Sequence, residues 1–237
     1  MNDEYLSVKE VTGGYGDYIV IDGVSLRIKK GQVVALLGPN GHGKTTLARM
    51  ISCLIPISIG AITFRGERID GHHPDQVVRL GISHIPQGDQ VFTQMSVEEN
   101  LLAGAYLRWE GRQNRVAEIL STFPQLEQRK QVAARVLSGG ERRMLALARG
   151  LMSSPSLLIV DEPSLGLAPR MRETLYDLLK KISVTGTSML LIEEKTSHLQ
   201  GLADYVYVME SGKIVLNGET ADVLNNTDEL MKALIGV

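Results

Sequence analysis

One short segment constrains this chain more than any other. Residues 38–45 read Gly-Pro-Asn-Gly-His-Gly-Lys-Thr and fit the pattern G-x-x-x-x-G-K-[ST]. The apolar run 33–37 before it predicts a strand, and residues 46–50 after it can open a helix. Glycines let successive backbone N–H groups of such a turn point at one polyphosphate. We therefore expect a phosphate-binding loop between a strand and a helix.

Two side chains of this loop carry specific chemistry. Lys44 would supply a cation to the β- and γ-phosphates of a nucleotide, and the hydroxyl of Thr45 would bind Mg²⁺. The alternative is a glycine-rich turn that ends in Lys-Thr by chance, and the flanking strand and helix argue against it. The predicted nucleotide-binding residues of the loop are Gly38, Pro39, Asn40, Gly41, His42, Gly43, Lys44, Thr45 and Thr46.

A second apolar strand, residues 157–160, leads directly into Asp161 and Glu162. Acids at the carboxyl end of a strand in an α/β sheet lie where such sheets bind ligands. Asp161 would bind Mg²⁺, and Glu162 would orient and deprotonate an attacking water. Alone, the two acids could merely cap the next helix. Together with the phosphate loop, they predict nucleotide hydrolysis.

A third motif, Leu-Ser-Gly-Gly-Glu at residues 137–141, precedes an amphipathic helix. Ser138 and Glu141 fit a capping box, so the motif could be no more than a well-capped helix. However, its two glycines leave bare N–H groups at the helix start, which is a good anion site. Since the chain already has one phosphate loop, we interpret Ser138, Gly139 and Gly140 as binding the γ-phosphate of a nucleotide held by another copy.

The order of strand and helix patterns indicates the architecture. Short strands with turn residues between them fill the first third of the chain, and residues 96 to about 136 are helical and polar. Afterwards helices alternate with the apolar strands 157–160, 189–192 and 206–209, which is typical of a buried parallel sheet. We expect a single α/β domain over residues 1–237. Residues 1–95 and 145–237 would form its core, and residues 96–144 a helical subdomain.

Charge and hydropathy exclude two classes of function. With a net charge of −2 over 237 residues, the chain has no overall electrostatic attraction to nucleic acid, so no nucleic-acid partner is expected. No run approaches the roughly 18 apolar residues of a membrane helix. We therefore expect the chain to remain in the cytosol unless a partner holds it at a membrane.

The three motifs together resemble the nucleotide-binding subunits of ABC transporters, over nearly the whole chain. Residues 38–46 match the family's Walker A loop, residues 137–141 its signature, and residues 158–162 its acidic strand. The resemblance implies the ABC ATPase fold, a P-loop core with a parallel sheet, an N-terminal antiparallel β subdomain and a helical insertion. It also implies that Tyr15 stacks on adenine. Gln87 would act in catalysis, as the residue that senses Mg²⁺ and the transmembrane partner.

The segments 85–88, 97–101 and 161–169 resemble one subgroup, the shorter ATPase of the branched-chain amino acid importers. This implies ATP and Mg²⁺ as cofactors, with ATP between the phosphate loop of one subunit and residues 138–140 of the other. The implied partners are integral membrane permease subunits, a second ABC ATPase subunit in a hetero- or homodimer, and a solute-binding protein. The chain would be peripheral at the cytoplasmic face of the cell membrane and would power uptake of a branched-chain amino acid or a related small polar solute.

Several positions depart from the family pattern. Glu194 occupies the place of a histidine that contacts the γ-phosphate, and a carboxylate there is unfavourable unless it turns away, becomes protonated or faces a cation. His198 either reaches inward in its place or lies on the surface. His42 and Gln87 also differ from near relatives. Phe92, Met95 and Val97 form either core packing or a permease-binding groove.

These departures leave three alternative functions. The chain could serve a urea or amide importer, because close relatives do so. It could be a catalytically weak, regulatory ATP-binding subunit, which Glu194 motivates. It could also be a soluble ABC ATPase with no role in transport, although such proteins typically have two cassettes or long insertions.

Overall fold

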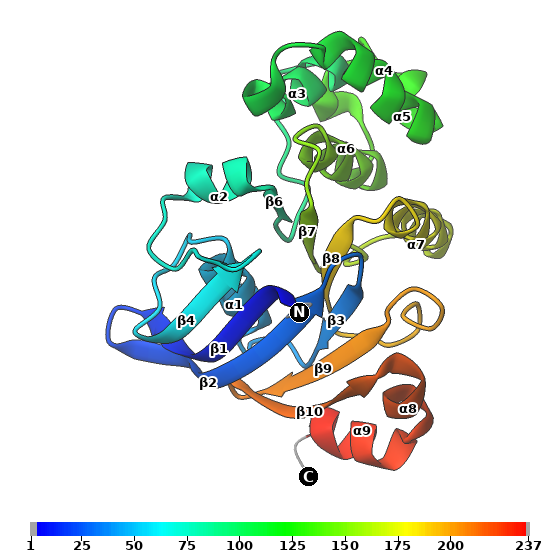
Figure 1. Ribbon diagram of the computed structural model, residues 1–237. Coiled ribbons are helices and arrows are strands. Elements are labelled where there is room, and N and C mark those ends of the chain that lie inside the picture. Colours follow the sequence, from blue (N-terminus) through cyan, green and yellow to red (C-terminus); the bar gives the residue numbers. More distant parts are fainter. Residues whose placement is uncertain (1–3, 236–237) are drawn as a thin grey trace.

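Two β-sheets organise the chain, and the computed structural model describes residues 4–235 of it (Figure 1). Residues 1–3 and 236–237 of the predicted domain lie outside this range. The N-terminal sheet is antiparallel, as expected, with the strand order β2-β1-β4-β5. Its strands are β1 (Glu4–Tyr15), β2 (Tyr18–Lys29), β4 (Ile59–Phe64) and β5 (Glu67–Arg68).

The second sheet has six strands in the order β10-β9-β3-β8-β7-β6. All neighbours pair in parallel except β9 and β10, which are antiparallel. The sequence patterns did not predict β6 or β10, because β6 is short and polar in part and β10 is only half-buried. The strands are β3 (Val33–Leu37), β6 (Ile82–Ile85), β7 (Leu157–Asp161), β8 (Ser188–Glu193), β9 (Tyr205–Glu210) and β10 (Lys213–Glu219).

Strands β3, β7 and β8 of this sheet are buried on both faces, which explains their continuous apolar runs. In β3, Val34 and Leu36 pack into a core shared with the N-terminal sheet and with α1 (Lys44–Ile51). Their neighbours Val33, Ala35 and Leu37 face a second core on the opposite side of the sheet. Because successive side chains of a strand point to opposite faces, one five-residue strand contributes to both cores.

Helices build the second core. Residues 97–151 form the helical segment at the top of Figure 1, and α7 lies beside the sheet. The helices of this segment are α3 (Val97–Gly104), α4 (Arg112–Thr122), α5 (Pro124–Glu127) and α6 (Gly139–Leu151). The other helices are α2 (Pro74–Leu80), α7 (Pro169–Ser183), α8 (Thr220–Asn225) and α9 (Thr227–Ile235). The predicted fold class, a parallel α/β core with an N-terminal antiparallel sheet and a helical insertion, is thereby confirmed.

The helical segment and the sheet share their hydrophobic contacts. Leu101 of α3, Leu120 of α4 and Leu147 of α6 belong to the same buried cluster as Leu158 and Leu191 of the sheet.

The predicted boundary between residues 144 and 145 falls inside α6, which is continuous.

Within residues 4–235, no helix has both the length and the apolar character required to cross a bilayer.

Candidate nucleotide site

Four neighbouring parallel strands end at the same edge of the central sheet. In the order β3, β8, β7, β6, they lead into the phosphate loop, Glu193, Asp161 and the segment containing Gln87. The carboxyl ends of parallel strands are where α/β sheets bind ligands. The topology therefore collects residues from four distant parts of the sequence along one edge.

The phosphate loop passes close to the neighbouring strand β9. Gly38 has φ +153°, and a Cβ there would lie 2.2 Å from the carbonyl oxygen of Met209. Gly43, with φ +102°, ends the loop in a left-handed conformation directly before α1. Such a conformation favours glycine. A pocket of about 300 Å³ opens over the loop and is lined by Val20, Asn40, Gly41, Gly43, Lys44, Thr45, Thr46, Gln87 and Glu162.

Lys44 lies at the base of this pocket with only 3% of its surface exposed. Its ammonium group donates hydrogen bonds to the carbonyl oxygens of Gly38 at 2.7 Å and Pro39 at 3.0 Å. It also lies 3.7 Å from a carboxylate oxygen of Glu162. Burial lowers the pKa of Lys44, and the carboxylates of Glu162, Asp161 and Glu194 oppose that shift. The loop thus holds its lysine in place through its own carbonyl groups.

Asp161 is a buried carboxylate that lacks hydrogen-bond partners. It is 1% exposed, and neither of its carboxylate oxygens has a partner among the described residues. Burial raises the pKa of Asp161, and the nearby Thr45 hydroxyl partly offsets the shift without donating a hydrogen bond of normal geometry. Buried carboxylate oxygens without partners are costly unless they bind a cation. The Asp161 and Thr45 oxygens therefore fit a divalent cation.

Glu162 is held between Gln87 and Lys44. The Gln87 side-chain amide donates a hydrogen bond to the Glu162 carboxylate at 2.8 Å. The backbone N–H of Glu162 donates a hydrogen bond to the Ile192 carbonyl oxygen at 2.9 Å. The backbone of Glu162 is left-handed, with φ +44°, and the residue is only 5% exposed. Such a conformation costs on the order of 1–3 kcal/mol for a residue other than glycine and is common at functional sites.

Glu194 lies beside the phosphate loop, in contact with Asn40, although it does not itself line the pocket. Its carboxylate accepts a hydrogen bond from the Asn40 side-chain amide at 3.1 Å. The ring of His198 stacks on the ring of Tyr176, with centroids 4.3 Å apart, and does not line the pocket. The structure thus places Glu194, and not His198, next to the loop.

The sequence reasoning missed Glu193, the last residue of β8. Glu193 is 4% exposed and accepts hydrogen bonds from the hydroxyls of Tyr176 and Ser164. Burial raises the pKa of Glu193, and the two hydroxyls oppose the shift. An apolar strand that ends in two acids was the signal for Asp161 and Glu162. The same signal is present at Glu193 and Glu194.

His42 connects the phosphate loop to the turn between β9 and β10 through two hydrogen bonds. Its ring Nδ1 accepts a hydrogen bond from the Ser211 N–H at 3.0 Å, and its carbonyl oxygen accepts one from the Gly212 N–H at 3.1 Å. The histidine side chain therefore has a partner within its own chain.

Two of the predicted binding elements lie apart from this pocket. Tyr15, at the end of β1, is 48% exposed, and its hydroxyl accepts a hydrogen bond from Arg49 at 2.9 Å. Ser138 is the exposed N-cap of α6 and forms the predicted capping box with Glu141. Neither Tyr15 nor residues 138–140 line the phosphate-loop pocket. One chain thus gathers the loop, both acids and Gln87, while the start of α6 does not contribute to the pocket over its own loop.

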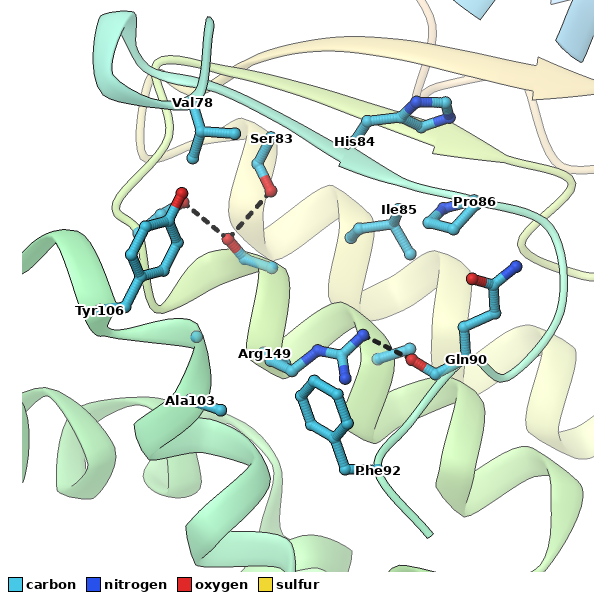
Figure 2. A pocket seen from close by; sticks show the side chains of 14 residues that line it. Val78, Ser83, His84, Ile85, Pro86, Gln90, Phe92, Ala103, Tyr106 and Arg149 are labelled. Atoms are coloured by element: carbon cyan, nitrogen blue, oxygen red, sulfur yellow. Dashed lines mark hydrogen bonds between the residues drawn. The ribbon is translucent and has the colours of Figure 1, made fainter. Parts of the chain in front are cut away.

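A second hollow, of about 360 Å³, lies beside the segment that contains Gln87, since Pro86 and Gln90 line it (Figure 2). The end of β6, the end of α3 and one side of α6 line it, and its rim carries the exposed rings of Phe92 and Tyr106. Met95 is also exposed, whereas Val97 is fully buried in the core. Val97 therefore belongs to the core, and the permease-binding groove stays a prediction for Phe92 and Met95.

Known proteins resemble this chain along most of its length. The family model described as ABC transporter matches residues 21–165. The branched-chain amino acid transport ATP-binding protein BraG of Pseudomonas aeruginosa is 36% identical, over 93% of this chain and 95% of its own length. The Nod factor export ATP-binding protein I of Cupriavidus pinatubonensis is 35% identical over 93% of this chain but 68% of its own length.

Among solved structures, the ADP conformation of MJ1267, an ATP-binding cassette of an ABC transporter, is similar over 96% of this chain and 97% of its own length. Its TM-score is 0.85 at 27% sequence identity. The predicted ABC ATPase fold and ATPase class are confirmed, and this chain belongs to the ABC transporter family.

Proposed function

We propose that this chain is the ATP-hydrolysing subunit of an importer for branched-chain amino acids or a related small polar solute. One observation carries the hydrolytic part, namely the row of Lys44, Asp161, Glu162 and Gln87 along one edge of the sheet. The groups for phosphate binding, cation binding and water activation lie side by side there. Such a set serves phosphoryl transfer from a nucleotide.

In this proposal, different residues of the chain bind the phosphates, bind the cation and activate the water. The backbone N–H groups of residues 40–46 and the Lys44 ammonium hold the phosphates. Thr45 and Asp161 would hold Mg²⁺, with Gln87 beside them, and a bound ion would supply positive charge against the nucleotide phosphates. Glu162, oriented by the Gln87 amide, accepts a proton from the attacking water. This orientation of Glu162 supports full catalytic competence over a purely regulatory role.

The site is completed by a second ABC ATPase subunit. The N-terminus of α6, at Ser138, Gly139 and Gly140, would bind the γ-phosphate of a nucleotide on the partner's loop. Ser138 is exposed and does not line the pocket of its own chain, which supports this arrangement. Tyr15, exposed at the end of β1, would stack on the adenine.

The hollow beside the Gln87 segment would receive a helix of an integral membrane permease (Figure 2). Apolar grooves with aromatic rims are suited to amphipathic helices. This contact would hold the chain peripherally at the cytoplasmic face of the membrane, and a solute-binding protein would deliver the solute to the permease.

The end-to-end match to BraG supports the branched-chain amino acid assignment. By contrast, the matched exporter subunit extends well beyond the aligned region, because only 68% of it is covered. Import of a branched-chain amino acid is therefore the assignment we favour.

The test uses the complex purified from membranes by a tag on this chain. We expect permease subunits to copurify, and ATP hydrolysis and leucine uptake into proteoliposomes to depend on this chain. Glu162→Gln in this chain alone should lower single-turnover hydrolysis at least 100-fold while nucleotide still binds. Unchanged turnover would contradict the role of Glu162, and copurification with no integral membrane protein would contradict the transport function.

A further inference from the structure

Three arginines of α6 bind the segment that follows Gln87. Arg142 pairs with the Asp89 carboxylate, Arg143 donates to the Gly88 carbonyl oxygen, and Arg149 donates to the Gln90 carbonyl oxygen. Figure 2 shows the last of these contacts, below the strand that leads to Gln87. Three consecutive residues are thus fixed to one helix, and Gln87 directly precedes them.

Arg142 contacts both this segment and the start of its own helix. Its Nη1 donates a hydrogen bond to the Leu137 carbonyl oxygen at 2.7 Å, and Leu137 immediately precedes Ser138. Its other terminal nitrogen, Nη2, lies 3.9 Å from the position that a Cβ of Gly139 would occupy. One guanidinium group therefore lies between the Asp89 carboxylate and the exposed N-terminus of α6.

Arg143 is the rigid part of this connection. It is 6% exposed, and its charge faces the carboxylates of Asp89, Asp161, Glu162 and Glu193. Burial lowers the pKa of Arg143, and these four carboxylates oppose that shift. Because a buried cation is costly to separate from its partners, Arg143 keeps Gly88 in place while the more exposed Arg142 can move.

We propose that Arg142 is a positioning residue that couples the anion site at the start of α6 to Gln87 and Glu162 of the same chain. The inference rests on the proposed function, in which a γ-phosphate of the partner's nucleotide occupies the anion site. That phosphate and Asp89 compete for one guanidinium group. When the phosphate attracts Arg142, the Asp89 contact breaks and the segment holding Gln87 is released on that side.

This arrangement supplies the two states that coupling requires. Without the anion, Arg142 holds Asp89, and the Gln87 amide holds Glu162 at 2.8 Å. With the anion bound, Gln87 is free to readjust as hydrolysis proceeds. The state of one nucleotide site is thus transmitted to the other through a single side chain.

The experiment measures ATP hydrolysis by the reconstituted transporter as a function of ATP concentration. The wild-type complex should respond cooperatively to ATP. Arg142→Gln in this chain should bring the Hill coefficient to about 1. Asp89→Asn should lower the half-saturating ATP concentration several-fold, because Arg142 is then available to the phosphate. Arg142→Lys should behave as Arg142→Gln does, since one ammonium cannot pair with Asp89 and reach the Leu137 carbonyl oxygen in the way that the guanidinium fork does.

Arg129→Gln is the matched control. Arg129 pairs with Glu141 at 3.0 Å at the same helix start but has no contact with Asp89 in the structure. It should therefore leave the Hill coefficient unchanged, and thermal unfolding of every variant identifies loss through misfolding. A wild-type Hill coefficient near 1, or an unchanged one in Arg142→Gln, overturns the coupling. If Glu162→Gln abolishes hydrolysis in the same preparation, that failure leaves the proposed function standing.

Discussion

At the scale of single residues, the charge balance of the phosphate pocket is unusual. Asp161, Glu162 and Glu194 surround one lysine, and each bears on the pKa of that lysine. A divalent cation bound as proposed would offset the charge of Asp161, and Gln87 and Lys44 contact Glu162. Within residues 4–235, the Glu194 carboxylate is hydrogen-bonded to the neutral Asn40 amide and to no cation. Its negative charge therefore opposes a polyphosphate in the pocket.

Replacing Glu194 with glutamine should strengthen nucleotide binding. The glutamine carbonyl can still accept from Asn40, so the change mainly removes the charge. We expect the dissociation constant of Mg-ATP to fall about two- to fivefold at low salt, as for a partly screened charge, with a smaller effect at high salt. Titration with a fluorescent ATP analogue measures it.

Glu173→Gln, on the exposed face of α7, is the control for net charge. If both variants bind nucleotide as the wild type does at low salt, the charge of Glu194 has no influence on the pocket.

The positions of residues that belong to a local sequence motif were predictable from the sequence. Contacts between residues that are distant in the sequence were not. Lys44, Asp161 and Glu162 lie in motifs whose neighbours determine their position. The contacts of Arg142 with Asp89 and of Tyr176 with Glu193 join residues 53 and 17 positions apart. The local sequence does not indicate such a partner, because the two residues come into contact only when the helices pack on the sheet.

At the scale of elements, the start of α6 has two roles that can be separated. Its capping box resembles the one on α3, where Ser96 accepts from the Glu99 N–H at 3.2 Å and donates back to the Glu99 carboxylate at 2.7 Å. In α6 the corresponding distances are 3.3 Å and 2.8 Å for Ser138 and Glu141. The two helix starts are thus nearly identical in local chemistry, and only the one at α6 is proposed to bind phosphate.

Ser138→Ala and Ser96→Ala should therefore have equal effects on stability and different effects on activity. Each removes one cap and should cost about 1 kcal/mol of unfolding free energy. Only Ser138→Ala should slow ATP turnover by the complex, by about tenfold or more. Urea unfolding of the isolated chain and turnover of the complex provide the two measurements. Equal losses of turnover in the two variants would mean that Ser138 acts only as a cap.

Most strands of the central sheet were predictable from the sequence, and the exceptions have a physical reason. Strands buried on both faces gave continuous apolar runs, as at residues 157–160 and 189–192. By contrast, β10 reads Lys-Ile-Val-Leu-Asn-Gly-Glu and has no fully buried residue. Its position depends on pairing with β9, which the sequence pattern alone does not reveal.

At the scale of the whole molecule, the two cores are joined through the central sheet. Leu36 and Leu37 are adjacent and fully buried, yet they belong to different cores. The helical segment 97–151 packs into one of these cores together with β7 and β8. A domain whose elements share a core in this way should unfold as one unit.

We expect the urea transitions followed by far-UV circular dichroism and by the fluorescence of Trp109 to coincide. Trp109 is the single tryptophan and lies before α4, where the guanidinium of Arg112 covers its ring at 3.9 Å. Leu147→Ala in α6 should shift both transitions together and destabilise the chain by about 2–5 kcal/mol. Two separate transitions would show that the helical segment unfolds independently of the sheet.

The left-handed backbone of Glu162 has a consequence for the choice of residue at this position. Exchange of this residue for glycine would relieve roughly 1 kcal/mol of backbone strain, but it would also remove the carboxylate that contacts Lys44 and Gln87. Backbone conformation alone would thus favour glycine at this position, and the proposed role of the carboxylate in hydrolysis accounts for a glutamate there.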